Sequence, residues 1–428
     1  MSGLLMDDVD GLDAALFPLA ASAGDSTGER LVRAIAVGNR ISVAAESEAS
    51  YVAEVERIVG LAAPHFASDR PNLLTLTELL GLPAALVGAR GALARRARRA
   101  QTALSLLAVA YLPRILRIRR RWPGISLARA LLLARADALY RPLAETLARL
   151  AVAHRTHIVA TTLAPRLRRS TDPREIAAWG RADAPAVYVP TGPEVYNAAL
   201  VFGPDGALLG RVDKVFLTES ESATLDLTPG RLDDVQVIAT DAGRLGVAIS
   251  LDAFTPAYLR RLAEQGAQIV VQPDANDQPW AAPSATSDWQ PAEWLGSVFG
   301  SIQPIYLSLR YNVCAMQTGN FFDIVFDGQS SITARDGAVT TMNGRPDPAQ
   351  TFVGVAEHRH LATGESLVGG FVALAPWVAP DPAVADPTLT LADRRARLAA
   401  RGRALAPRAA HANDYRESVI WADLRLDA

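Results

Sequence analysis

Short runs of β-branched residues alternate with helical stretches along most of this chain. This alternation is typical of layered α/β folds, in which helices cover a sheet. With half of its 428 residues hydrophobic and a net charge of −2, the chain can build one large α/β domain or two ordinary ones. The turn residues Gly203-Pro204-Asp205-Gly206 predict a hairpin. Strands are expected at 32–37, 73–77, 157–163, 195–202, 207–215, 246–250, 267–272, 312–317, 324–334, 350–357 and 418–424, and helices at 51–65, 140–153, 256–265 and 391–405.

Residues 79–136 differ in charge from the rest of the chain. They include twelve arginines and no acidic residue, so this stretch has a charge of +12 and the remainder −14. We interpret the stretch as a helical insert with an arginine-rich helix at 92–101, an apolar piece at 103–112, a break at Pro113 and a basic piece at 114–121.

Several roles are open for this insert. A basic amphipathic helix can lie on an anionic membrane surface or cover a hydrophobic substrate. The ordinary alternative is a solvated helical lid or a dimer contact, because basic faces are most often simply exposed to water. Nucleic-acid binding is not indicated, since the basic residues lack interleaved stacking aromatics and a recognisable module.

Lysine and cysteine each occur only once in the sequence. Lys214 is the only lysine among 43 basic residues, which suggests a position that arginine cannot fill. An ammonium is a compact charge that can approach a single oxyanion, whereas the wider guanidinium suits partners with two oxygens. Chance survival of one exposed lysine is the alternative. Cys314 is the only cysteine, so disulfides and cysteine-rich metal sites are excluded, and it lies in a run that predicts a buried strand.

No cofactor or metal site is predicted, since the six histidines have no partners at ligand spacing. The acidic N-terminal region (Asp7, Asp8, Asp10, Asp13) differs from a secretory signal, and no apolar run reaches the length of a membrane span. We therefore expect a cytoplasmic protein, with membrane association through the insert left open.

Ordered motifs in this chain resemble those of the nitrilase superfamily of carbon-nitrogen hydrolases. The resemblance covers about 32–375, interrupted by the insert, and the closing strand. Its motifs are Tyr196-Asn197-Ala198-Ala199-Leu200-Val201-Phe202, Lys214 two residues before Phe216-Leu217, Thr228-Pro229-Gly230, Gly243-Arg244-Leu245-Gly246-Val247-Ala248-Ile249-Ser250, Ile269-Val270-Val271-Gln272-Pro273-Asp274-Ala275-Asn276 and Phe326-Asp327-Gly328-Gln329-Ser330.

This resemblance implies a four-layer αββα sandwich and a mechanism based on Glu, Lys and Cys. The glutamate after the second strand matches Glu78, although Thr77 replaces the usual proline before it. The lysine matches Lys214, and a second glutamate matches Glu221, with Glu219 as the alternative. The position of the cysteine nucleophile is occupied by Ser250.

The replacement of cysteine by Ser250 has a chemical cost. A thiol with a pKa of about 8.5 ionises easily beside a lysine, whereas an alcohol is several units higher. Without further changes the barrier would rise by roughly 5 kcal/mol, or some thousandfold in rate. Serine can still act when a base is well placed and the oxyanion is stabilised. Cys314 is more than sixty residues away and is not expected to substitute.

Two classes of function follow. The first is an amidase-like hydrolase or acyl transferase, with Glu78 as base, Ser250 as nucleophile, Lys214 as oxyanion stabiliser and Glu221 in support. The second is a catalytically silent relative that binds an amide-like or lipid-like ligand or assembles with other copies. Since the insert directly follows Glu78, we expect it near the pocket mouth, and we expect a ligand with an apolar part.

The domain organisation predicted from these features has three parts. They are an N-terminal extension at 1–30, a carbon-nitrogen hydrolase domain at 31–375 with the insert at 79–136, and a C-terminal extension at 376–428 that ends in a strand. A homodimer is expected by analogy with the family, with the helix at 391–405 as a candidate contact.

Overall fold

The computed structural model describes residues 30–180, 183–278, 280, 290–335, 358–359, 366–367, 370–377, 386–405 and 415–426. The expected N-terminal extension, apart from Arg30, and the strand expected at 350–357 lie outside the described residues.

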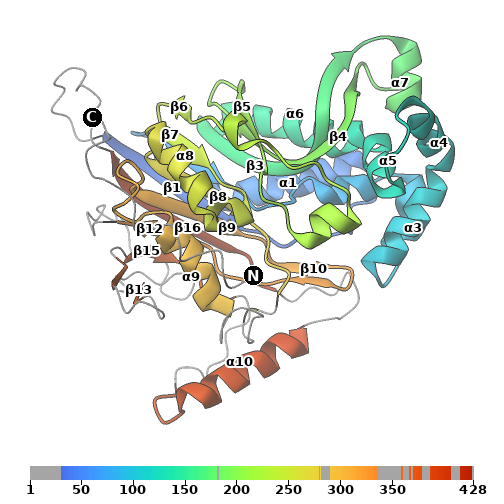
Figure 1. The fold of residues 1–428 in the computed structure, drawn as a ribbon. Coiled ribbons are helices and arrows are strands. Elements are labelled where there is room, and N and C mark those ends of the chain that lie inside the picture. The colour runs from blue at the N-terminus through green and yellow to red at the C-terminus, as the bar shows by residue number, and fades with distance from the viewer. Residues whose placement is uncertain are drawn as a thin grey trace.

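Two six-stranded mixed sheets form the centre of the fold (Figure 1). In each sheet the central strands are parallel and the outer pairs antiparallel. The first sheet has the order β16 (Ser418–Leu426), β1 (Arg30–Gly38), β2 (Asn72–Thr75), β3 (Thr156–Ser170), β4 (Val187–Phe202) and β5 (Leu208–Asp213). The second has the order β15 (Gly370–Leu374), β12 (Ser331–Ala334), β9 (Tyr311–Met316), β8 (Ile269–Asp274), β7 (Gly243–Val247) and β6 (Ile238–Thr240).

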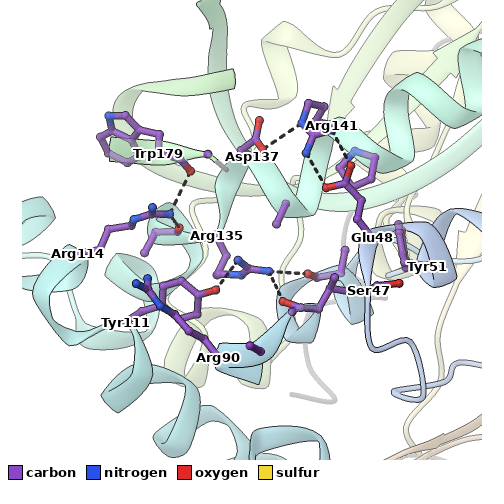
Figure 2. Close-up of a pocket in the computed structure, with 18 of the residues that line it drawn as sticks. Ser47, Glu48, Tyr51, Arg90, Tyr111, Arg114, Arg135, Asp137, Arg141 and Trp179 are labelled. Atoms are coloured by element: carbon purple, nitrogen blue, oxygen red, sulfur yellow. Dashed lines mark hydrogen bonds and ion pairs between the residues drawn. The ribbon is translucent and has the colours of Figure 1, made fainter. Parts of the chain in front are cut away.

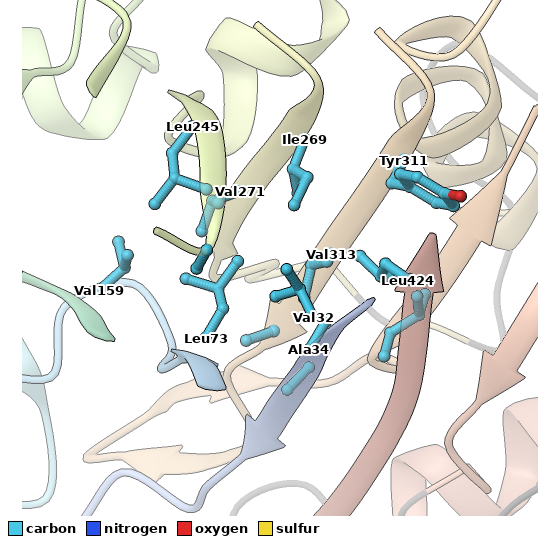
Figure 3. Close-up of a cluster of buried hydrophobic side chains, with 14 of the residues drawn as sticks. Val32, Ala34, Leu73, Val159, Leu245, Ile269, Val271, Tyr311, Val313 and Leu424 are labelled. Atoms are coloured by element: carbon cyan, nitrogen blue, oxygen red, sulfur yellow. The ribbon is translucent and has the colours of Figure 1, made fainter. Parts of the chain in front are cut away.

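One apolar cluster is built from both sheets (Figure 3). Val32 and Leu73 of the first sheet belong to it together with Val271 and Val313 of the second, and all four are fully buried. Because strand side chains alternate between faces, the residues between those of this cluster point to the opposite face of each sheet.

Helices cover these opposite faces. On the first sheet, Ile35 and Leu74 pack with α1 (Glu48–Ala62) and α6 (Ala136–His154). On the second, Val270 packs with α8 (Pro256–Glu264). Another cluster joins Cys314 to α9 (Gln290–Gly300), a helix that the sequence pattern did not predict. Each sheet therefore has both faces buried, which explains why its strands are continuously apolar rather than alternating.

Residues 79–136, here called the basic segment, form a helical layer beside the first sheet (Figure 1). The single helix expected at 92–101 is wrong: α2 (Ala92–Arg95) ends after one turn and α3 (Ala100–Ala110) begins five residues later. The break near Pro113 is present, since α4 (Leu112–Arg121) starts there with proline in its first turn. Two 3₁₀ turns, η2 (Leu82–Leu86) and η3 (Ala89–Gly91), precede α2, and α5 (Leu127–Ala134) completes the segment.

The chain ends return to the same sheet. β16 runs antiparallel to β1 over its whole length, and Arg33 donates to the buried Asp423 at 2.6 Å.

The strand expected at 324–334 is in fact two strands, β11 (Ile324–Phe326) and β12. The remaining elements are α7 (Pro173–Trp179), β10 (Gly319–Phe321), β13 (His358–Arg359), β14 (Ser366–Leu367), α10 (Leu391–Leu405), and the short helices η1 (Ala63–His65), η4 (Ser220–Thr224), η5 (Leu232–Asp234) and η6 (Ser250–Phe254). Of the helices described, none has the length and apolar character needed to cross a membrane.

Candidate active site

Lys214 is buried at the end of β5, with 1 % of its surface exposed. Its Nζ donates to Glu78 Oε1 and to Glu221 Oε2, each at 2.8 Å. The backbone also holds it in place, because its N–H donates to the carbonyl of Asn197 and its carbonyl accepts from Gly230. The structure thus brings together three of the residues predicted from the sequence, Glu78, Lys214 and Glu221, and it does so with Glu221 rather than the alternative Glu219.

Glu78 is placed by a sharp turn directly after β2. The next residue, Leu79, has a φ of 62°, in the left-handed region, and its N–H donates to Thr161 Oγ1 at 2.6 Å. Thr77, at the position where the family usually has proline, is buried, and its hydroxyl lies 2.6 Å from Gln317 Oε1. Side-chain hydrogen bonding therefore fixes the chain in front of Glu78.

Asn197, in the middle of β4, is a member of this cluster that the sequence interpretation missed. Its Nδ2 donates to Glu78 Oε1 at 2.7 Å and to Glu221 Oε1 at 2.8 Å. The amide consequently bridges the two carboxyl groups, sharing Oε1 of Glu78 with the ammonium and using the other oxygen of Glu221. One feature of the sequence could have indicated this role: Asn197 is a single amide residue within the apolar run of β4.

The two glutamates differ in protonation. Burial, together with the carboxyl groups of Glu221 and Asp274, raises the pKa of Glu78 to about 8 against the opposing effect of Lys214. Burial also acts to raise the pKa of Glu221, but Lys214 and hydrogen bonds from Asn197 and Thr218 hold it below the ordinary value. Burial disfavours the charge of Lys214, yet the two glutamates raise its pKa. At neutral pH the cluster therefore pairs one ammonium with one carboxylate, and Glu78 keeps its proton.

Ser250 is the first residue of η6, shortly after the end of β7. Its φ of 46° lies in the left-handed region, which is uncommon for a residue with a side chain and indicates a strained backbone at this turn. Its hydroxyl lies near the carboxyl of Asp274, which lines the same cavity, and acts to lower the pKa of that carboxyl. In the described part of the chain, no hydrogen bond joins Ser250 to Glu78 or Lys214.

Asp274, at the end of β8, links Ser250 with the lysine cluster. It is buried, and this burial raises the pKa of its carboxyl, opposed by a hydrogen bond from Gln272, by the nearby hydroxyl of Ser250 and by the charge of Lys214. The carboxyl groups of Asp274 and Glu78 in turn repel each other when both are charged. The sequence interpretation quoted Asp274 within a motif without giving it a role, because the direction of its side chain depends on the register of β8.

A second buried carboxyl fixes the segment after Lys214 beside Ser250. Asp252 accepts the backbone N–H groups of Val215 at 3.1 Å and of Phe216 at 2.8 Å. Burial raises the pKa of Asp252 to about 7. Since Asp252 lies two residues after Ser250, these bonds hold the two segments in contact.

Ser250 lines a cavity of about 250 Å³. Asp274 also lines it, and Trp280 and Trp294 form an aromatic wall with ring centroids 5.2 Å apart. Cys314 is fully buried in β9, and this burial raises the pKa of its thiol well above the usual value, as expected for an unreactive cysteine. Within the described residues no group of histidine, cysteine and acidic side chains could hold a metal ion.

The sequence profile of the carbon-nitrogen hydrolases matches residues 122–357, more than half of the protein. The chain belongs to the carbon-nitrogen hydrolase family. The match includes Lys214, Glu221 and Ser250, whereas Glu78 and most of the basic segment lie before it.

Solved structures with a similar course of the chain come from the same superfamily. A carbon-nitrogen hydrolase from Helicobacter pylori G27 has 15% identity and a TM-score of 0.46, covering 81% of this chain and 89% of its own. Nit3 of Saccharomyces cerevisiae, of the nitrilase superfamily, has 15% identity and a TM-score of 0.43, covering 85% and 97%. An amidase from Nesterenkonia sp. has 16% identity and a TM-score of 0.39, covering 81% and 89%. Comparison with curated protein sequences gave no match. The family membership rests on the sequence profile.

Proposed function

We propose that this carbon-nitrogen hydrolase acts on non-peptide amide bonds through a Glu-Lys-Ser variant of the family triad, built on a four-layer αββα sandwich of the nitrilase type. The observation that supports it most is the buried cluster of Glu78, Lys214 and Glu221, with 2.8 Å contacts from the ammonium to both carboxyl groups. Burying three ionisable side chains costs free energy, and such a cluster adds little net stability to the fold. A purely structural role therefore does not explain it.

The proposed reaction starts from the fraction of molecules in which Glu78 is ionised, which grows as the pH approaches its pKa of about 8. Ser250 Oγ attacks the carbonyl carbon of the amide and its proton passes to the carboxylate of Glu78. Lys214 stabilises the developing oxyanion, and Asp274 positions the hydroxyl. Glu78 then returns the proton to the leaving nitrogen, so the C–N bond breaks and an ester on Ser250 remains. Water attacks the ester in a hydrolase, and an amine does so in an acyl transferase; either step restores the hydroxyl.

The raised pKa of Glu78 suits this role. A base works best when its pKa is close to the working pH, because it must both accept and return the proton. With a pKa of about 8, the Glu78 carboxyl is a stronger base than an ordinary glutamate. The serine hydroxyl needs such a base more than a thiol would.

A silent binding or assembly protein is the second candidate. It is favoured by the absence, in the described residues, of a hydrogen bond from Ser250 to Glu78 or Lys214. In this alternative the buried cluster persists because its polar groups satisfy one another.

A test uses the purified full-length protein and ammonia release from aliphatic amides of increasing chain length. We expect turnover by the wild type and a loss of at least about a hundredfold in Ser250→Ala. Ser105→Ala, an exposed serine on α3, is the matched control. Binding of amides without turnover, equal in wild type and Ser250→Ala, would favour the silent alternative.

The basic segment is proposed to contact an anionic membrane surface at its periphery. Leu93, Leu106, Val109, Leu112 and Leu116 are exposed in this segment, Val109 to 71 %. Arg119 and Arg120 at the end of α4 are also exposed and follow Leu116 by three and four residues, so apolar and cationic side chains are neighbours on this helix. We also propose a homodimer, with the exposed helix α10 as a contact.

A further inference from the structure

A second cavity lies between the basic segment and the helices on the first sheet (Figure 2). It has a volume of about 640 Å³, within the usual range for small-molecule sites. Residues from the start of α1, from η2 to η3, from α4, α5 and α6 and from the end of α7 line it. It shares no lining residue with the cavity at Ser250. The proposed hydrolysis leaves this cavity without a role.

Three guanidinium groups surround one buried tyrosine in this cavity. The guanidinium carbons of Arg135, Arg90 and Arg114 lie 4.9, 5.3 and 5.9 Å from the ring centroid of Tyr111. The Tyr111 hydroxyl accepts from Arg135 Nη1 at 2.7 Å. Figure 2 shows the three arginines around the tyrosine at the side of the cavity.

Carboxyl groups do not neutralise these three arginines. Glu48 and Asp137, which also line the cavity, both pair with a fourth arginine, Arg141, at 2.7 and 3.1 Å. In the described part of the chain, Arg90, Arg114 and Arg135 have no ion pair, and the remaining acidic lining residue, Glu46, contacts none of them at ion-pair distance. The cavity is therefore left with an excess of positive charge.

The hydrogen bonds of these arginines differ. Arg135 is used structurally, because it donates to the backbone carbonyls of Ala84, Ala85 and Val87 at the end of η2. Arg114 donates to two carbonyls through Nη1 alone. Among described residues, Nε and Nη2 of Arg114 have no acceptor, and no acceptor is found for Arg90.

The free edge of Arg114 is the one that binds carboxylates elsewhere in this protein. Arg33 uses its Nε and Nη2 together to hold Asp423, at 2.6 and 3.0 Å. This edge presents two parallel N–H groups that match two oxygens of a carboxylate or phosphate. Burial and the neighbouring charge of Arg135 also lower the pKa of Arg114, and a bound anion would relieve this repulsion.

We propose that this cavity binds an anionic small molecule through a phosphate or carboxylate group held by Arg90 and Arg114. The rest of the ligand is apolar, because Ala84, Val87, Ala134 and Trp179 line the adjoining part of the cavity. The site is distinct from the proposed nucleophile and does not depend on Ser250.

The test titrates the full-length protein with octyl phosphate, octanoate, inorganic phosphate and octanol, and measures binding by calorimetry and by the fluorescence of Trp179 and its neighbour Trp122. We expect saturable binding of octyl phosphate or octanoate, and about a tenfold or greater loss of affinity in Arg114→Gln and in Arg90→Gln. Arg260→Gln changes an exposed arginine on α8, outside both the cavity and the basic segment; it is the control and should bind as the wild type does.

The four probes test the anionic and the apolar parts of the ligand separately. If inorganic phosphate binds as tightly as octyl phosphate, the anion site is supported, but the proposal that the rest of the ligand is apolar is overturned. Equal binding of octanol would overturn anion recognition. The proposal as a whole fails if no probe saturates, or if both cavity variants bind like Arg260→Gln. Because Arg90 is exposed and makes no hydrogen bond among described residues, Arg90→Gln is expected to fold even if Arg114→Gln does not.

Discussion

Arg129 holds Asp226 at two points, with Nη2 2.8 Å from the carboxylate and Nε 2.7 Å from the backbone carbonyl. Arg129 belongs to α5 of the basic segment, and Asp226 follows η4, the short helix that positions Glu221. Asp226 itself has a φ of 54°, so this contact also supports a strained turn. The basic segment is thereby fastened to the loop of the candidate active site.

We predict that Arg129→Gln loosens this loop. The pair is partly exposed, so the expected loss in the free energy of unfolding is small, about 1 kcal/mol. Local hydrogen exchange at residues 217–228 should nevertheless rise clearly, while Arg119→Gln, on an exposed part of α4, should leave it unchanged. Equal protection in both variants would show that the contact does not hold the loop.

Removing the lysine should destabilise the fold strongly. Lys214→Met leaves the carboxylate of Glu221 buried without its partner, which typically costs about 3–5 kcal/mol in the free energy of unfolding. Urea denaturation at neutral pH measures this loss. The double variant Lys214→Met/Glu221→Gln has no unpaired charge and should recover a large part of it; a double variant as unstable as the single one would contradict the charge assignment.

Stability should also depend on pH through Glu78. Its pKa is about 8 in the folded protein and 4.5 as the ordinary value, so between these pH values the folded state holds a proton that the unfolded chain has lost. The stabilising contribution is complete below about pH 4.5 and is lost as the pH rises to about 8, with a slope of at most about 1.4 kcal/mol per pH unit. Unfolding across this window should therefore show a steeper decline in the wild type than in Glu78→Gln. Parallel curves would mean that Glu78 is already ionised at neutral pH.

Vesicle binding tests the surface of the basic segment. The wild type should co-sediment with vesicles that contain phosphatidylglycerol, less so at high salt, because arginines supply part of the attraction. Val109→Asp/Leu112→Asp should abolish binding, since both exposed side chains lie on this surface. Leu208→Asp/Leu209→Asp changes two exposed leucines of β5 and serves as the control. Membrane contact through this segment is excluded if the two double variants behave alike.

Some features of the fold follow from short stretches of sequence, and others depend on residues that are far apart in the chain. The burial of Cys314 and the course of β1 and β2 follow from short apolar runs. The meeting of Glu78 with Lys214, 136 residues apart, was accessible only through the family resemblance.

Other features depend on tertiary contacts that the sequence pattern does not show. The break between α2 and α3 falls in an arginine-rich stretch with good helix propensity, where packing overrides local preference. The roles of Asn197 and Asp274 depend on strand register, which decides the face on which each side chain lies.

Intact-mass measurement of an acyl adduct tests the central claim, that Ser250 is the nucleophile. Wild type and Ser250→Cys are incubated with the same panel of amides, with Ser250→Ala as the blank. We predict an acyl adduct on the wild type that maps to Ser250 and is missing from Ser250→Ala. An adduct on Ser250→Cys alone would indicate a preserved but silent pocket, and the absence of any adduct on either protein would contradict the proposed chemistry.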